Sequence, residues 1–273
     1  MKVEISIVMT AYNRAELVRA TLNSFKANGY DNSVEVIIVD DGSREPLSLS
    51  EKYPFEVRVI RNEPEGKWYM NPCIPYNQGF NEARGEKVVI QNAECAHRHN
   101  IVEYLKSRSL VGRYVSFGCY SLTQAESEVI KENLLTELTL NDFSAPADGE
   151  SGWYNHSIYR PSGYHFCSAL MKSDLDKLGG FDPVYAEGSC FDDDEFLYRV
   201  KESLQIDFCD ELYVYHLWHY SGGAHRDKYK FLRNRMLYQL YTKRKLPKSL
   251  VIFAWRIYEL IARRVSFNNL KAN

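Results

Sequence analysis

The six cysteines of this 273-residue chain are scattered, and no two of them stand at the C-x-x-C spacing. That spacing is typical of zinc sites and redox pairs, so its absence argues against a zinc centre, and the scatter gives no disulfide framework. We therefore expect a reduced protein of the cytoplasm. The chain also lacks internal repeats and low-complexity segments, so we expect an ordinary globular fold.

Long apolar runs are missing as well. The short apolar run before Tyr12 follows Glu4, and we interpret it as a buried strand and not as a secretory leader. Near the C-terminus, Arg256, Glu259 and Arg263 interrupt the apolar positions. This segment is therefore too polar to span a membrane.

Net charge is small, formally −2, but the charges are unevenly divided. Residues 226–273 hold 13 Lys and Arg against two acids, so this tail carries +11 and residues 1–225 carry −13. We expect an acidic domain over residues 1–225 and a basic helical tail over residues 226–273. The acidic body would repel phosphate, which argues against a nucleic-acid partner.

The tail pattern predicts two helices, over residues 229–245 and 250–265, with apolar side chains among Arg and Lys. Such helices could lie on an anionic membrane surface with Trp255 at headgroup depth, making the protein peripheral at the inner face of the membrane. They could equally pack against the domain or against a second subunit in a homodimer. The sequence leaves these interpretations open.

Residues 1–225 alternate strand and helix signals. Continuous apolar runs are typical of strands buried on both faces, and helical periodicity follows several of them. We therefore predict an α/β fold with a mostly parallel, Rossmann-like sheet and helices on both faces. The predicted strands are residues 5–9, 34–39, 57–60, 87–90, 114–120, 166–171 and 212–215, and the predicted helices are residues 17–25, 76–83, 101–105 and 195–204.

Polar side chains follow four of these strands, at residues 10–14, 40–43, 91–94 and 216–219. Ligands of parallel sheets bind at the carboxyl ends of the strands, so we expect the four segments to converge on one cleft. Each segment alone has a local explanation, since turn-forming residues are common after strands. Their coincidence favours a functional site.

Four consecutive carboxylates, Asp192 to Glu195, precede a helical pattern. Because like charges repel, the cluster predicts a catalytic base or a metal pocket, and a base placed there would have a raised pKa. The alternative is that Asp192 or Asp193 caps the helix, since acids at a helix N-terminus satisfy free N–H groups.

Six short segments in this order resemble glycosyltransferase family 2, whose members are inverting enzymes with the GT-A fold. The resemblance covers roughly residues 3–219 and says nothing certain about the tail. The segments are SIVMTAYNR at 6–14, VIIVDDGS at 36–43, NQG at 77–79, ARGE at 83–86, GGFD at 179–182, and the pair of acids at 192–193 with Arg199.

The resemblance implies roles for the matched positions. Asp193 matches the acid that deprotonates the acceptor hydroxyl, Asp192 takes the other acidic position, and His216 matches a residue that helps bind the metal or the diphosphate. Tyr12 would stack near the nucleobase and Asp40 would bond the base edge. The implied nucleotide-binding residues are Thr10, Ala11, Tyr12, Arg14, Asp40, Asp41, Asn77 and Asn92.

The D-x-D metal motif of the family stands here as Asn92-Ala93-Glu94, so an amide replaces one carboxylate. Mn²⁺ and Mg²⁺ favour oxygen ligands and accept an amide carbonyl. We therefore expect a divalent cation, Mn²⁺ or Mg²⁺, held by Glu94, Asn92 and His216. His219 could add a ligand, or it could pack at the domain edge.

The acceptor is expected at the long polar segment of residues 141–165, where Trp153 and Tyr154 offer flat faces to sugar rings. Aromatic residues are also common in ordinary cores and lids.

We thus expect an inverting hexosyl- or N-acetylhexosaminyltransferase that moves a sugar from a UDP-linked nucleotide sugar to a glycan or lipid-linked glycan, as in surface polysaccharide synthesis. One alternative is a non-catalytic nucleotide-sugar-binding protein, suggested by the altered metal motif. A sugar nucleotidyltransferase is a further alternative, but it would carry a Gly-rich loop after the first strand, and residues 10–14 contain no glycine.

Overall fold

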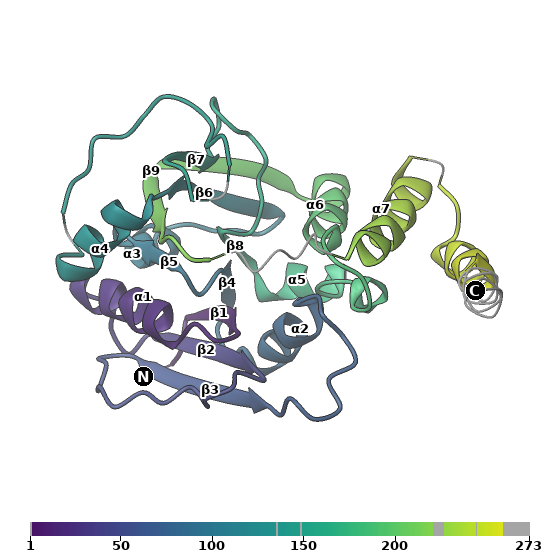
Figure 1. Cartoon of the computed structure of the whole chain (residues 1–273). Coiled ribbons are helices and arrows are strands. Elements are labelled where there is room, and N and C mark those ends of the chain that lie inside the picture. Colours follow the sequence, from purple (N-terminus) through teal and green to yellow (C-terminus); the bar gives the residue numbers. More distant parts are fainter. Residues whose placement is uncertain (1, 135, 148, 221–226, 244, 259–273) are drawn as a thin grey trace.

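The structure, a computed structural model, describes residues 2–134, 136–147, 149–220, 227–243 and 245–258 (Figure 1). Its strands are β1 Ile5–Ala11, β2 Val34–Asp41, β3 Glu56–Asn62, β4 Lys87–Gln91, β5 Cys95–His97, β6 Arg113–Ser121, β7 Gly152–Asn155, β8 Cys167–Met171 and β9 Gln205–His216. Its helices are α1 Ala15–Ala27, α2 Cys73–Glu82, α3 Ile101–Lys106, α4 Gln124–Glu132, α5 Lys172–Leu178, the short 3₁₀ turn η1 Pro183–Tyr185, α6 Asp192–Ser203 and α7 Lys228–Thr242.

The strands form one nine-stranded sheet in the order β3-β2-β1-β4-β8-β6-β9-β5, with β7 on β6. The ladders β3-β2-β1-β4 and β6-β9 are parallel, whereas β8 runs antiparallel between β4 and β6. The α/β class is as predicted, and the antiparallel β8 makes the sheet as a whole mixed. Because β8 is flanked by antiparallel ladders on both sides, β6 and β9 still run in the direction of β1, and their carboxyl ends meet at one edge.

Helices cover both faces of the parallel half, as predicted (Figure 1). Alternate residues of β1 point to opposite sides, so Ile7 packs in the same core as Phe25 of α1 and Val8 packs in the same core as Phe80 of α2. A Cβ atom on Gly79 of α2 would lie 2.4 Å from Val8 Cγ1, so this glycine lets α2 approach the sheet closely.

The buried carboxylate of Glu35 explains the ARGE segment without any catalytic role. Glu35 accepts hydrogen bonds from Ser6 Oγ at 2.6 Å, from Arg84 Nε at 2.8 Å and from Arg58 Nη2 at 3.0 Å. Burial alone raises the pKa of this carboxyl, but these donors outweigh it and lower the pKa. The segment therefore fastens the start of β4 to β2.

Residues 141–165 are not wholly irregular, because they contain β7, which pairs with β6. The tail begins with α7, which packs against α6 (Figure 1). Helical backbone follows over residues 248–258, and the rest of the helix predicted over residues 250–265 lies outside the described residues.

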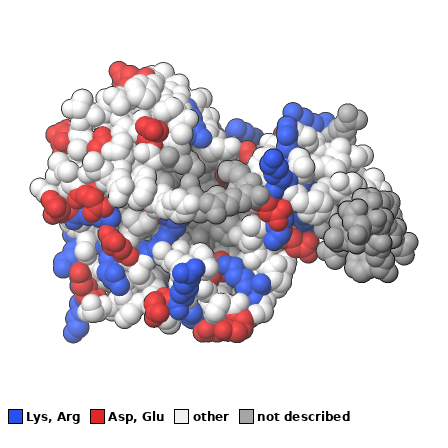
Figure 2. All heavy atoms as spheres, viewed as in Figure 1, with Lys and Arg blue, Asp and Glu red and all other residues white. Residues whose placement is uncertain are grey.

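Among the residues that the structure describes, no helix combines the length and the apolar character that crossing a bilayer requires. Acidic and basic side chains are intermixed over the face in Figure 2, including the junction between the body and the C-terminal helices.

Candidate active site

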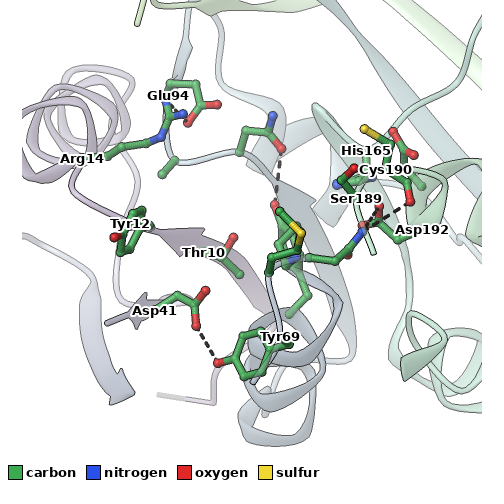
Figure 3. A pocket seen from close by; sticks show the side chains of 18 of the residues that line it. Thr10, Tyr12, Arg14, Asp41, Tyr69, Glu94, His165, Ser189, Cys190 and Asp192 are labelled. Atoms are coloured by element: carbon green, nitrogen blue, oxygen red, sulfur yellow. Dashed lines mark hydrogen bonds and ion pairs between the residues drawn. The ribbon is translucent and has the colours of Figure 1, made fainter. Parts of the chain in front are cut away.

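A cavity of about 770 Å³ lies at the carboxyl edge of the sheet (Figure 3). Segments that follow β1, β2 and β4 meet the start of α6 there, as the strand-end pattern predicted. The sequence-predicted residues that line the cavity are Thr10, Ala11, Tyr12, Arg14, Asp41, Asn92, Glu94, Asp192 and Asp193.

One end of the cavity presents aromatic rings beside a carboxylate. Asp41 accepts hydrogen bonds from Tyr69 Oη at 2.6 Å and from Lys67 Nζ at 2.5 Å. The Lys67 ammonium also lies 4.9 Å from the centre of the Tyr12 ring, which is half exposed. A flat, half-exposed ring next to a carboxylate acceptor suits a planar heterocycle that carries N–H groups.

Two predicted nucleotide ligands do not reach the cavity. Asp40 is fully buried, and its carboxylate accepts from Ser43 N at 3.1 Å, Leu47 N at 2.9 Å and Arg61 Nη1 at 2.8 Å. Burial raises the pKa of Asp40, but these donors more than compensate and lower it. The structure therefore corrects the expectation of a base-edge contact: Asp40 holds the turn, and its neighbour Asp41 faces the cavity.

Asn77 is the second correction. Its Nδ2 donates to Phe181 O at 2.7 Å and its Oδ1 accepts from Phe181 N at 2.8 Å. Both ends of the amide are thus used to hold the Gly-Gly-Phe-Asp segment against α2. Asn77 supports the site from outside and does not line it.

The β5-β9 ladder brings a carboxylate and two imidazoles together. Cys95 pairs with His216, and Leu217 N donates to Glu94 O at 2.9 Å, so the ends of two distant segments are locked side by side. The Nε2 atoms of His216 and His219 lie 3.5 Å and 3.3 Å from the same oxygen, Glu94 Oε1. The candidate ligand atoms of these three residues all lie within 4.8 Å of one another.

Glu94 stays ionised in this setting. Burial by itself raises its pKa, but the hydrogen bonds with His216 and His219 and the nearby Arg14 hold the pKa well below its usual value. Arg14 Nη1 lies 3.6 Å from Glu94 Oε2. An ionised carboxylate and two convergent imidazoles fit a divalent metal ion, and Asn92 lies on the same cavity walls.

A smaller cavity of about 230 Å³ shares Asn92, Glu94 and Phe166 with the large one and includes His216 and His219. Tyr154 lines it, although its side chain is as buried as that of Trp153 and belongs to the main core, and Arg160 lies over the Tyr154 ring at 5.4 Å. Trp153, the other expected acceptor residue, is buried, and its indole packs on Tyr120 and Tyr213. Its ring face is therefore part of the core, which corrects that expectation.

The acidic cluster forms the first turn of α6. The N-cap residue is Phe191, in left-handed backbone with φ of 67°, so neither Asp192 nor Asp193 is the N-cap, although Asp193 still satisfies one free N–H group of the first turn. Asp192 is buried and accepts from Asn71 Nδ2 at 2.7 Å. Asp193 accepts from the N–H of Asp194 at 2.9 Å, and its side chain reaches the cavity.

Desolvation raises the pKa of Asp193 well above its usual value, and the neighbouring Asp192 and Asp194 raise it further. The pKa of Asp192 is also raised, first by burial, although the Asn71 hydrogen bond opposes the shift. A carboxyl group with a raised pKa is better matched to proton transfer near neutral pH.

The sequence reasoning missed the loop after β3, which supplies Lys67, Tyr69 and Asn71 to the cavity. It did not single out His165 and Phe166, which precede β8, although His165 ends the polar segment that was expected to face the acceptor. The rule that ligands bind beyond strand ends applies equally to β3 and would have found the first group. Nothing in the sequence showed that β8 runs antiparallel, so its amino end was not expected at this edge.

Comparison with solved structures defines the class of fold. S. aureus TarS 1–349 in complex with UDP-GlcNAc has a TM-score of 0.61 at 16% identity, over 91% of this chain and 69% of that chain. The mannosyltransferase PcManGT from Pyrobaculum calidifontis, in complex with GDP-Man and Mn²⁺, has a TM-score of 0.50 at 17% identity, over 90% and 64%. The chain has the GT-A fold, as predicted.

Residues 6–121 match the family model described as "Glycosyl transferase family 2". An uncharacterized glycosyltransferase of Haemophilus influenzae is 46% identical over 59 residues, which are 22% of this chain and 20% of that protein. An uncharacterized glycosyltransferase of Nostoc sp. is 28% identical over 118 residues, covering 40% and 35%. The matches thus span about a fifth to a third of these relatives. The resemblance to glycosyltransferase family 2 is therefore confirmed for the segment from β1 to β6, which is less than half of the chain.

Proposed function

We propose that this protein is an inverting glycosyltransferase that moves a hexosyl or N-acetylhexosaminyl group from a UDP-linked nucleotide sugar to a glycan or lipid-linked glycan. The observation that carries the proposal is the shared cavity: Glu94 and Asp192 lie on different sides of it (Figure 3), and Asp193 lines it as well. Such a separation suits a displacement in which a base and a leaving group must act from different sides of one carbon.

The nucleotide would occupy the end lined by Tyr12 and Asp41, with Thr10 and Ala11 beneath it. Arg14 pairs with Glu94, and its guanidinium would contact a diphosphate bound beside that carboxylate. The sugar would extend toward α6. The complexes of TarS with UDP-GlcNAc and of PcManGT with GDP-Man support a nucleotide-sugar donor, and they contain different nucleotides.

In the transfer step the acceptor oxygen forms a bond to the anomeric carbon while the bond from that carbon to the diphosphate oxygen breaks. The acceptor proton goes to the Asp193 carboxylate, and the leaving diphosphate keeps the bonding electron pair. Asn71 holds Asp192 in place beside the base. One displacement of this kind inverts the anomeric configuration.

Glu94, His216 and Asn92 would hold a divalent cation, with His219 as a further ligand, and the cation would neutralise charge on the leaving diphosphate. Two imidazole nitrogens suit Mn²⁺ better than Mg²⁺, which prefers an all-oxygen shell. We therefore propose Mn²⁺ over Mg²⁺.

The membrane proposal rests on the exposed side chains of the second tail helix. Leu250, Phe253 and Ile257 are exposed and fall on one side of residues 248–258. The exposed Arg256 lies in the same helix, which suits a peripheral position at an anionic cytoplasmic membrane surface and surface polysaccharide synthesis.

The test is a binding and turnover screen. Thermal unfolding is followed with UDP, GDP and uridine, each with Mn²⁺, Mg²⁺ or a chelator, and nucleotide release is then measured from UDP- and GDP-sugars. A rise in melting temperature with UDP that needs Mn²⁺, followed by UDP release, supports the proposal. Stabilisation without turnover on any donor and acceptor pool would favour a non-catalytic nucleotide-sugar-binding protein, the interpretation that the Asn92 amide suggests.

A further inference from the structure

Lys248, at the start of the second tail helix, reaches back onto the catalytic domain. Its Nζ donates to Glu195 Oε1 at 2.6 Å and also pairs with Asp182 Oδ2. The Lys248 side chain is one-fifth exposed, and the Glu195 side chain is fully buried. The same ammonium lies 4.2 Å from the centre of the Tyr241 ring on α7. Lys248 therefore connects three parts of the chain.

Glu195 belongs to the first turn of α6, two residues after Asp193. Arg199 holds its carboxylate from the next turn, with Nε to Oε1 at 2.9 Å and Nη2 to Oε2 at 2.7 Å. Arg199 Nη2 also donates to Gly180 O at 2.8 Å. The carboxylate thus has one partner within the helix and one from the tail, and the tail partner supplies the second positive charge.

Asp182 connects this pair to the segment that leads into α6. Its Oδ1 accepts from Val184 N at 2.9 Å and so caps η1, while its Oδ2 is the atom that pairs with Lys248. The chain then passes through Ser189 and Cys190, which line the cavity, to the first turn of α6. The Lys248 ammonium therefore contacts both the segment that enters α6, through Asp182, and the first turn of α6, through Glu195.

Further contacts strengthen the same junction. Asn234 of α7 donates to Tyr185 O and to Cys190 O, each at 2.9 Å. Arg233 donates to Val184 O at 2.9 Å. The segment before the catalytic acids is therefore held by the tail through main-chain carbonyls as well as through Lys248.

We propose that Lys248 is a positioning residue for the transfer reaction, which fixes the first turn of α6 and with it Asp193 at the cavity wall. This inference rests on the proposed function for its catalytic readout. It also means that residues 245–258 act with the catalytic domain and are not a separable membrane appendage.

The experiment compares Lys248→Met with Lys248→Arg, which restores a cation, and with Lys243→Met, a matched control at an exposed lysine just after α7. Amide hydrogen exchange over residues 190–199 is measured without any substrate. UDP release from UDP-GlcNAc with Mn²⁺ is measured separately for kcat and KM. We expect Lys248→Met to exchange faster over this segment and to lose at least about tenfold in kcat, with KM for the donor within about twofold. Lys248→Arg should recover most of both, and Lys243→Met should match the parent protein.

Unchanged exchange and kcat in Lys248→Met would overturn the inference, as would equal losses in Lys243→Met. A rise in KM alone would also overturn it, because that would place Lys248 in donor binding. Should Lys248→Met fail to fold by circular dichroism, Lys248→Gln carries the same expectations, since its shorter, neutral side chain removes the positive charge that pairs with Glu195 and Asp182. If the parent protein releases no nucleotide from any donor, the proposed function fails, and hydrogen exchange alone decides the positioning role.

Discussion

Replacing Asp193 by Asn tests the proposed base directly. The amide keeps the size of the side chain but cannot take a proton, so the cavity shape and the contacts of Tyr12 and Asp41 stay in place. A positioned general base contributes about 10²- to 10⁴-fold, which corresponds to about 2.7 to 5.4 kcal/mol of barrier. We expect kcat to fall by that factor while nucleotide affinity, measured by titration calorimetry, changes less than about twofold.

The matched control is Asp194→Asn. Asp194 carries the same charge one residue later, but its carboxylate accepts from Tyr164 Oη at 2.7 Å and is not part of the cavity lining. Removing it takes away one of the charges that raise the pKa of Asp193. Turnover should survive in this variant, and the acidic limb of its pH profile should move to lower pH, because the base then ionises more easily.

Thermal stability gives a second readout with a defined sign. Because folding raises the pKa of Asp193, proton binding to this carboxyl stabilises the folded protein. This stabilisation is fully present below the pKa of the unfolded chain and is lost as pH rises through the pKa of the folded chain. Asp193→Asn should therefore melt at a higher temperature than the parent protein in mildly alkaline buffer. This difference in melting temperature should become smaller as the pH is lowered. More than about a tenth of parental turnover, with an unchanged pH profile, would refute Asp193 as the base.

Three further outcomes follow from the structure. Glu94→Gln removes the ionised ligand that both imidazoles face, so Mn²⁺ affinity, measured by calorimetry, should fall at least about tenfold; unchanged affinity would place the metal elsewhere. Gly79→Ala adds a methyl group 2.4 Å from Val8 Cγ1 and should cost about 1–3 kcal/mol in urea unfolding; a neutral result would mean that α2 shifts freely. Phe253→Asp, at a side chain that is 64% exposed, should reduce binding to phosphatidylserine vesicles without changing the melting temperature; undiminished binding would contradict a membrane role for this face.

The buried parallel strands were predictable because their signal is local. In β1 and β2 nearly every side chain is buried, and such strands carry continuous apolar residues. Local periodicity also predicted the helix at residues 17–25, and α1 extends this range by two residues at each end. The long strand β9 was only partly found, because its first half is partly exposed and carries Asp207 and Asp210.

Other features depend on partners that are distant in sequence. Asp40 and Asp41 are adjacent and chemically identical, yet Arg61 and a backbone turn occupy the first while Lys67 and Tyr69 present the second to the cavity. No local pattern distinguishes the two. The antiparallel insertion of β8 is likewise a choice between long-range pairings, and the apolar run that predicts this strand is compatible with either direction.

The division of the site between two parts of the chain explains why the family match alone does not define the chemistry. Residues 6–121 supply the proposed nucleotide end and Glu94, whereas the two imidazoles and the acids of α6 come from residues 192–219, outside that match. Pairing of β5 with β9 joins the two parts, because it sets His216 opposite Cys95 and so beside Glu94. The candidate metal ligands are thus brought together by strand order. Any change that slips the register of this ladder by one residue would turn His216 to the opposite face and should abolish metal binding.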